Sequence, residues 1–107
     1  ARLARFTIKG TGMFGRITKF QGDPARLDEM VGRIPDIRAG VNQIAGGVAN
    51  WAMWNDDGSG VAIAVYEDEA AAIAAGPQIQ AIWGGLADLL TAPPEVTSYS
   101  HAEKTRD

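Results

Sequence analysis

Few side chains in this sequence can do chemistry. The 107 residues contain one histidine and no cysteine, which excludes thiol nucleophiles, disulfides and cysteine-based metal or iron–sulfur sites. One histidine is also too few for a His-rich metal site, so we predict no metal. The candidates that remain are one amide, one imidazole, four aromatic side chains and one guanidinium: Asn50, His101, Trp51, Trp54, Tyr66, Trp83 and Arg16.

Asn50 and His101 are the candidate catalytic residues. An imidazole is a common general base at neutral pH, although a histidine near the end of the last strand could equally be exposed or lie in an interface. A buried amide needs hydrogen-bond partners. For Asn50, which lies in an apolar strand, these partners could be the substrate, the neighbouring hairpin strand or a second subunit.

The candidate substrate-binding residues are Trp51, Trp54, Tyr66, Trp83 and Arg16. Large rings can contact a planar ligand, but they can also fill the core or a dimer interface of an alanine-rich chain. Arg16 could bind a substrate anion. Cross-strand pairing with acidic residues would explain Arg16 equally well.

Composition and motifs exclude several classes of partner and cofactor. With 46% hydrophobic residues and a net charge of −3, the chain has no general attraction for nucleic acid or anionic membranes, and it contains no apolar run long enough for a membrane helix. Residues 10–15 match the pattern G-x-G-x-x-G, but a strand-like segment follows where a dinucleotide site needs a helix. We therefore expect no cofactor and a cytoplasmic protein.

Hydrophobic periodicity divides the chain into four strands and two interrupted helices. Asp23 and Pro24 are typical of a helix start, as is Asp68, and Pro35 and Gly76-Pro77 should interrupt the two helices. The strands are expected at Phe14–Gln21, Val48–Asn55, Val61–Glu67 and Glu95–His101, with helical segments at 27–34, 37–44, 70–75 and 79–91.

This order predicts an α+β, ferredoxin-like βαββαβ domain over residues 13–102. Two interrupted helices should cover one face of a four-stranded antiparallel sheet with the order 4-1-3-2. Residues 1–12 are interpreted as a leader or extension able to add an edge strand, and 103–107 as a polar tail. The residues expected to face the sheet are Leu27, Met30, Val31, Ile34, Ile79, Ile82, Trp83 and Leu86.

The second face of the sheet also needs a cover. Trp51 and Trp54 alternate to opposite sides of their strand, so each face carries large apolar groups. Contiguous apolar patches of this kind are uncommon on monomers. We therefore predict a homodimer that buries sheet against sheet.

Residues 13–24 (MFGRITKFQGDP) and 61–70 (VAIAVYEDEA) give the chain a resemblance to the dimeric α/β-barrel superfamily. Over residues 13–102 it is most similar to small proteins related to antibiotic biosynthesis monooxygenases. The resemblance implies a barrel-forming dimer with a cavity in each subunit. It also implies oxidation of an aromatic or polyketide-like substrate by O₂ without metal or flavin. The alternative function is that of a non-catalytic ligand-binding or stress-associated dimer.

Haem degradation, which occurs in the same superfamily, is disfavoured for this chain. The resemblance implies that such relatives carry an axial histidine on the second helix and an asparagine on the first strand. This sequence has no histidine in residues 69–91 and no asparagine in residues 14–21.

Overall fold

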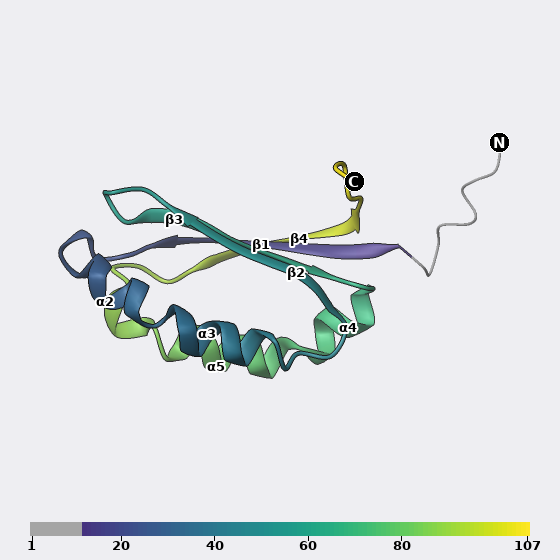
Figure 1. Cartoon of the computed structure of the whole chain (residues 1–107), viewed down its shortest axis with the longest axis horizontal. Coiled ribbons are helices and arrows are strands. Elements are labelled where there is room, and N and C mark those ends of the chain that lie inside the picture. Colours follow the sequence, from purple (N-terminus) through teal and green to yellow (C-terminus); the bar gives the residue numbers. More distant parts are fainter. Residues whose placement is uncertain (1–11) are drawn as a thin grey trace.

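The sheet has the predicted composition and order. The computed structural model describes residues 12–107. The predicted leader or extra edge strand at residues 1–12 therefore lies outside the described residues, except for Gly12. The four antiparallel strands lie in the order β2-β3-β1-β4 (Figure 1), which is the predicted order read from the other edge. Their bounds are β1 (Met13–Gln21), β2 (Gly47–Trp54), β3 (Ser59–Tyr66) and β4 (Glu95–Ala102).

Both helical segments are interrupted, as expected. The first comprises a 3₁₀ turn η1 (Pro24–Arg26) followed by α2 (Leu27–Gly32) and α3 (Ile34–Val41), and the second comprises α4 (Glu69–Ala74) and α5 (Gly76–Gly84). Side-chain caps begin each of them. Asp23 accepts a hydrogen bond from the Ala25 N–H at 2.9 Å, and Asp68 accepts one from the Ala71 N–H at 2.8 Å.

The end of the second helix differs from the prediction. We expected helical periodicity to continue to Thr91, whereas α5 ends at Gly84 and a separate 3₁₀ turn, η2 (Ala87–Leu89), follows. Two consecutive glycines, Gly84 and Gly85, explain the difference, because glycine weakens a helix. Apolar residues continue at helical spacing beyond Gly85 because η2 also buries an apolar side chain, that of Leu89, which is 1% exposed.

The helices cover one face of the sheet (Figure 1), and the core between the two layers consists of two clusters. The first, here called the α4 core, contains Phe14, Ile44, Tyr66, Ala72 and Ala75. The second, the α2 core, contains Met30, Leu86 and Leu89. Of the eight residues predicted to face the sheet, only Val31 is exposed, at 44%. The predicted helix phases are therefore confirmed.

Truncating the α2 core should destabilise the fold. Leu86→Ala removes a side chain that is 7% exposed and packs with Met30 and Leu89, so the free energy of unfolding should fall by about 2–5 kcal/mol. Chemical denaturation measures this change. The matched control is Ile73→Ala on α4, where the side chain is 67% exposed, and its effect should stay within about 0.5 kcal/mol. Equal effects of the two substitutions would contradict the assignment of Leu86 to the core.

In the described part of the chain, no helix has the length and apolar character that crossing a membrane requires.

Candidate functional site

A cavity of about 740 Å³ lies between the sheet and the helices. Residues of β1, β2, β3, α2, α3 and α5 line it, and it reaches both cores, since Tyr66 of the α4 core and Met30 and Leu86 of the α2 core belong to its wall. Its volume falls within the range of about 300–1,000 Å³ that is usual for small-molecule sites. The cavity is therefore the candidate site.

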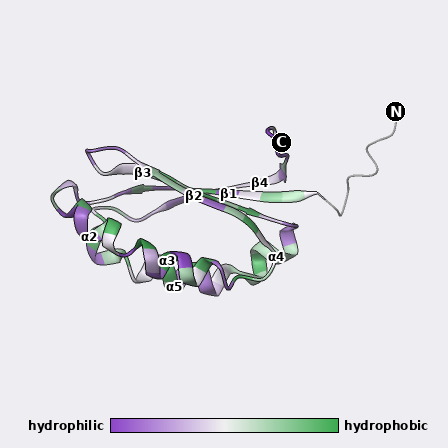
Figure 2. Ribbon diagram, viewed as in Figure 1, coloured by the Kyte–Doolittle hydropathy of each residue, from purple (hydrophilic) through white to green (hydrophobic). Residues whose placement is uncertain are grey.

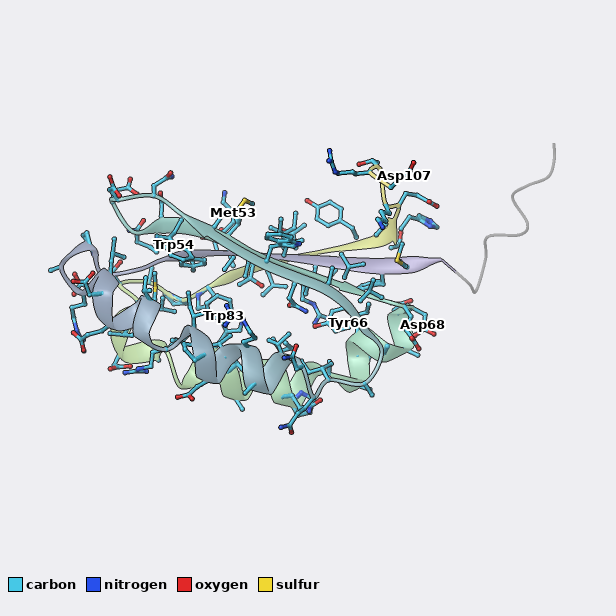
Figure 3. The ribbon with its side chains drawn as sticks, viewed as in Figure 1. Met53, Trp54, Tyr66, Asp68, Trp83 and Asp107 are labelled. Atoms are coloured by element: carbon cyan, nitrogen blue, oxygen red, sulfur yellow. The ribbon has the colours of Figure 1, made fainter. Side chains whose placement is uncertain are left out.

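Aromatic side chains form the end of the cavity near the α2 core. The ring centroids of Phe20 and Trp83 are 5.7 Å apart and the rings are tilted by 49°. Figure 3 shows Trp54 and Trp83 on the helix side of the sheet and Met53 on the other side. Gly60 lies opposite Phe20 in the sheet, and a Cβ there would come within 2.5 Å of the Phe20 ring. Glycine at this position is what leaves space for the ring.

Polar side chains of the central strands lie toward the α4 core. Tyr66 is 1% exposed, and its hydroxyl has no hydrogen-bond partner within the described residues. The Arg16 guanidinium carbon lies 5.5 Å from the centroid of the Tyr66 ring, in the range of a cation–π contact. Thr18, on the same strand as Arg16, is 4% exposed and also lines the cavity. This end of the cavity is therefore lined by polar side chains that carry hydrogen-bond donors.

Asn50 reaches the same cavity from the edge strand β2. Its side chain is exposed in the single chain, so the interpretation of Asn50 as a buried amide is wrong. It lies opposite Ala64 of β3, and strand alternation places it on the same face as Ala52 and Trp54. The small side chain of Ala64 leaves the amide room. Of the two candidate catalytic residues, Asn50 is the one that this chain brings to the cavity.

His101 and Trp51 are placed differently. His101 is an exposed residue of β4 and is not part of the cavity wall. Trp51 borders the cavity at the sheet edge, but it alternates with Asn50 and is 68% exposed. Its position in β2 therefore turns the ring to the outer face, by which we mean the sheet face away from the helices.

Of the two explanations for Arg16, cross-strand pairing with acidic residues is contradicted by the strand register. Lys19 does lie opposite Glu95, but Arg16 lies opposite Ala64 and Ser98. The strand register thus gives Arg16 no carboxylate neighbour, and Arg16 instead contacts the Tyr66 ring.

The salt bridges of the described residues are formed elsewhere, at the outer surface of the helical layer. Arg26 Nε lies 2.8 Å from Glu29 Oε2, and Arg33 Nη2 lies 3.4 Å from Asp88 Oδ2. The hydrogen bond from Arg26 holds the pKa of the Glu29 carboxyl below its ordinary value. The Arg33–Asp88 pair joins the first helical segment to η2, whereas Arg26 and Glu29 both belong to the first segment. No described carboxylate lines the cavity.

The sequence interpretation missed three polar residues of the cavity: Thr18, Arg38 and Asn42. A signal for the two helical residues was present. Arg38 follows Ile34 by four residues, and Asn42 follows Arg38 by four, which is the spacing of one helix face. Thr18 shares its strand face with Arg16 because the two are two residues apart.

Among residues 12–107, no three His, Cys, Asp or Glu side chains lie close enough together to hold a metal ion.

Comparison with known proteins identifies the fold. No family model matches the sequence, and no curated protein matches it. Solved structures do match. A protein from Caulobacter crescentus CB15 named "putative antibiotic biosynthesis monooxygenase" is 17% identical, with a TM-score of 0.74 over 91% of this chain and 96% of its own.

Two proteins from Nitrosomonas europaea are similar to the same degree. One, of unknown function, is 19% identical with a TM-score of 0.73 over 91% of this chain and 97% of its own. The other carries the same name as the Caulobacter protein and is 13% identical, with a TM-score of 0.71 over 84% of this chain and 90% of its own. The chain therefore has the ferredoxin-like α+β fold of the proteins named for antibiotic biosynthesis monooxygenases, as the sequence resemblance predicted.

Proposed function

We propose that this chain is a cytoplasmic homodimer that binds a planar aromatic or polyketide-like molecule and oxidises it with O₂ without a metal or flavin. The observation that carries the proposal is the cavity of about 740 Å³ between the sheet and the helices. Aromatic rings lie at one end of it, and the polar side chains of Arg16, Asn50 and Tyr66 line its wall. The names of structural neighbours from two bacteria point to the same class of reaction.

The proposed reaction needs little from the protein. An electron-rich phenol that has lost its proton can supply the electrons that O₂ requires. One oxygen atom then bonds to a ring carbon in place of hydrogen, and the other leaves as water, so that the phenol becomes a quinone. The protein must bind the ring, donate hydrogen bonds to the phenolate oxygen and exclude bulk water.

Asn50 is suited to hold that oxygen. The amide of Asn50 carries two N–H donors, and Asn50 lies in the cavity wall. Trp54, Trp83 and Phe20 would contact the face of the ring.

The test uses 1-naphthol, an electron-rich planar phenol, in a chelator-treated and flavin-free buffer. We expect the chain to consume one O₂ for each 1,4-naphthoquinone formed, with one atom of ¹⁸O₂ in the product. Oxygen electrode traces and mass spectrometry measure both quantities. Binding of 1-naphthol without O₂ consumption above the buffer rate would contradict the oxygenase and favour the non-catalytic ligand-binding dimer.

The homodimer is proposed from the outer face of the sheet. Trp51, Met53 and Tyr99 are 68%, 52% and 48% exposed, and strand register places Ile17 and Ile63 beside them. Figure 2 shows hydrophobic positions along the strands as well as along the helices, which cover only one side. A second copy of the same face would bury these side chains. The expected mass in solution is twice 11.3 kDa.

A further inference from the structure

The cavity wall contains cationic side chains and no anionic one. Arg16 reaches it from β1 and Arg38 from α3, while none of the described aspartates or glutamates contributes to it. The chain as a whole has thirteen acidic and ten basic residues. The absence of carboxylates is therefore a property of this site and not of the composition.

The two cavity arginines also differ from other arginines of the chain in their pairing. Arg26 and Arg33 form salt bridges with Glu29 and Asp88. Neither Arg16 nor Arg38 forms a salt bridge within residues 12–107. A guanidinium presents five N–H donors in a planar fork that matches a carboxylate. Arg16 is thus a cation in a concave, largely apolar site, without a salt-bridge partner among the described residues.

A second, independent observation concerns the neighbour of Arg16. The Tyr66 side chain is 99% buried, and its hydroxyl lacks a hydrogen-bond partner among the described residues. A buried polar group without a partner is uncommon and costly. Arg16 lies 5.5 Å from the Tyr66 ring. A ligand oxygen bound near both side chains would accept hydrogen bonds from each of them.

The strand spacing gives the length and orientation of such a ligand. Arg16 and Phe20 lie on the same face of β1, four residues apart, which corresponds to about 13 Å along the strand. Phe20 contacts Trp83 at the aromatic end of the cavity. A ligand that occupies both ends must therefore be apolar and planar at one end and anionic at the other.

We propose that the substrate class is a planar aromatic carboxylate. Its carboxylate binds to Arg16 and the Tyr66 hydroxyl, and its ring system lies against Phe20 and Trp83. Arg38 attracts the anion from the helical layer. The inference deepens the proposed function and rests on it, because it requires that the cavity bind a planar aromatic molecule.

The test compares two probes of the same shape, 2-naphthoate and its neutral amide 2-naphthamide, by isothermal titration calorimetry on the whole chain. Charge-assisted hydrogen bonds should make naphthoate bind about 10- to 100-fold more tightly than naphthamide. Raising the ionic strength should weaken the binding of naphthoate and leave that of naphthamide unchanged.

Substitutions then assign the effect to Arg16. Arg16→Met should remove the preference for naphthoate while naphthamide still binds, which also shows that the variant is folded. Arg38→Met should reduce the preference by a smaller factor, since Arg38 is exposed. The matched control is Lys19→Met, which removes the same charge from the opposite face of β1 and should preserve the preference.

Two results would overturn the inference, and they differ in their consequence for the proposed function. Equal affinities of the two probes, or an unchanged preference in Arg16→Met, would refute the carboxylate site and leave a neutral aromatic cavity in place. If neither probe bound, both the carboxylate site and the aromatic-binding cavity would be refuted.

Discussion

Replacing Asn50 by alanine is expected to lower the turnover of 1-naphthol by about 100-fold, the size of the loss when a positioned hydrogen-bond donor is removed from developing negative charge. Asn50 lies on the helix side of β2 in the cavity wall, opposite Ala64. Alanine cannot donate to a phenolate oxygen, but its small apolar side chain fits the strand. Fold and dimer should therefore persist while the reaction slows.

The control for Asn50→Ala is Gln80→Ala on α5. Gln80 is exposed and does not line the cavity, so this substitution removes a side-chain amide without touching the candidate site. Initial rates of O₂ consumption at saturating 1-naphthol would compare the two variants with the parent chain. If the rate for Asn50→Ala lay within twofold of the control, the proposed role of Asn50 in the reaction would be contradicted, and its amide would serve packing alone.

The fold could be predicted from the sequence because local signals and the global topology agree. Asp23 and Asp68 cap the helical segments, as their residue types and positions indicate. Right-handed connections between the strands then permit only one arrangement of this order of elements. The end of α5 at Gly84 could not be located in the same way. Apolar residues continue at helical spacing into η2, and periodicity alone cannot distinguish a helix from a tight turn that buries the same side chains.

The candidate site could be predicted only in part. Asn50, Trp54, Tyr66 and Trp83 were identified because polar or large aromatic residues stand out in apolar segments, and all four line the cavity. The partner of Arg16 depends on the register between strands far apart in the sequence.

That register places Arg16 beside small residues and the Tyr66 ring instead of acidic ones. Arg38 and Asn42 look like exposed polar positions of an amphipathic helix until the shape of the cavity shows that they border it.

The last and largest effect is expected at the outer face of the sheet. Trp51→Glu should convert the proposed dimer of about twice 11.3 kDa into a monomer at micromolar concentration. Trp51 is 68% exposed in one chain and shares its face with Met53 and Ile63. Burying an unpaired carboxylate in such an interface costs about 3 kcal/mol or more, which weakens a dimer by at least about 100-fold.

Ile73→Glu is the control for Trp51→Glu, because it places the same charge at an apolar side chain of nearly the same exposure, 67%, on α4 and away from the outer face. Sedimentation velocity should give the parent mass for this variant. A parent chain that sediments as a monomer, or a Trp51→Glu chain that remains a dimer, would contradict the proposed interface.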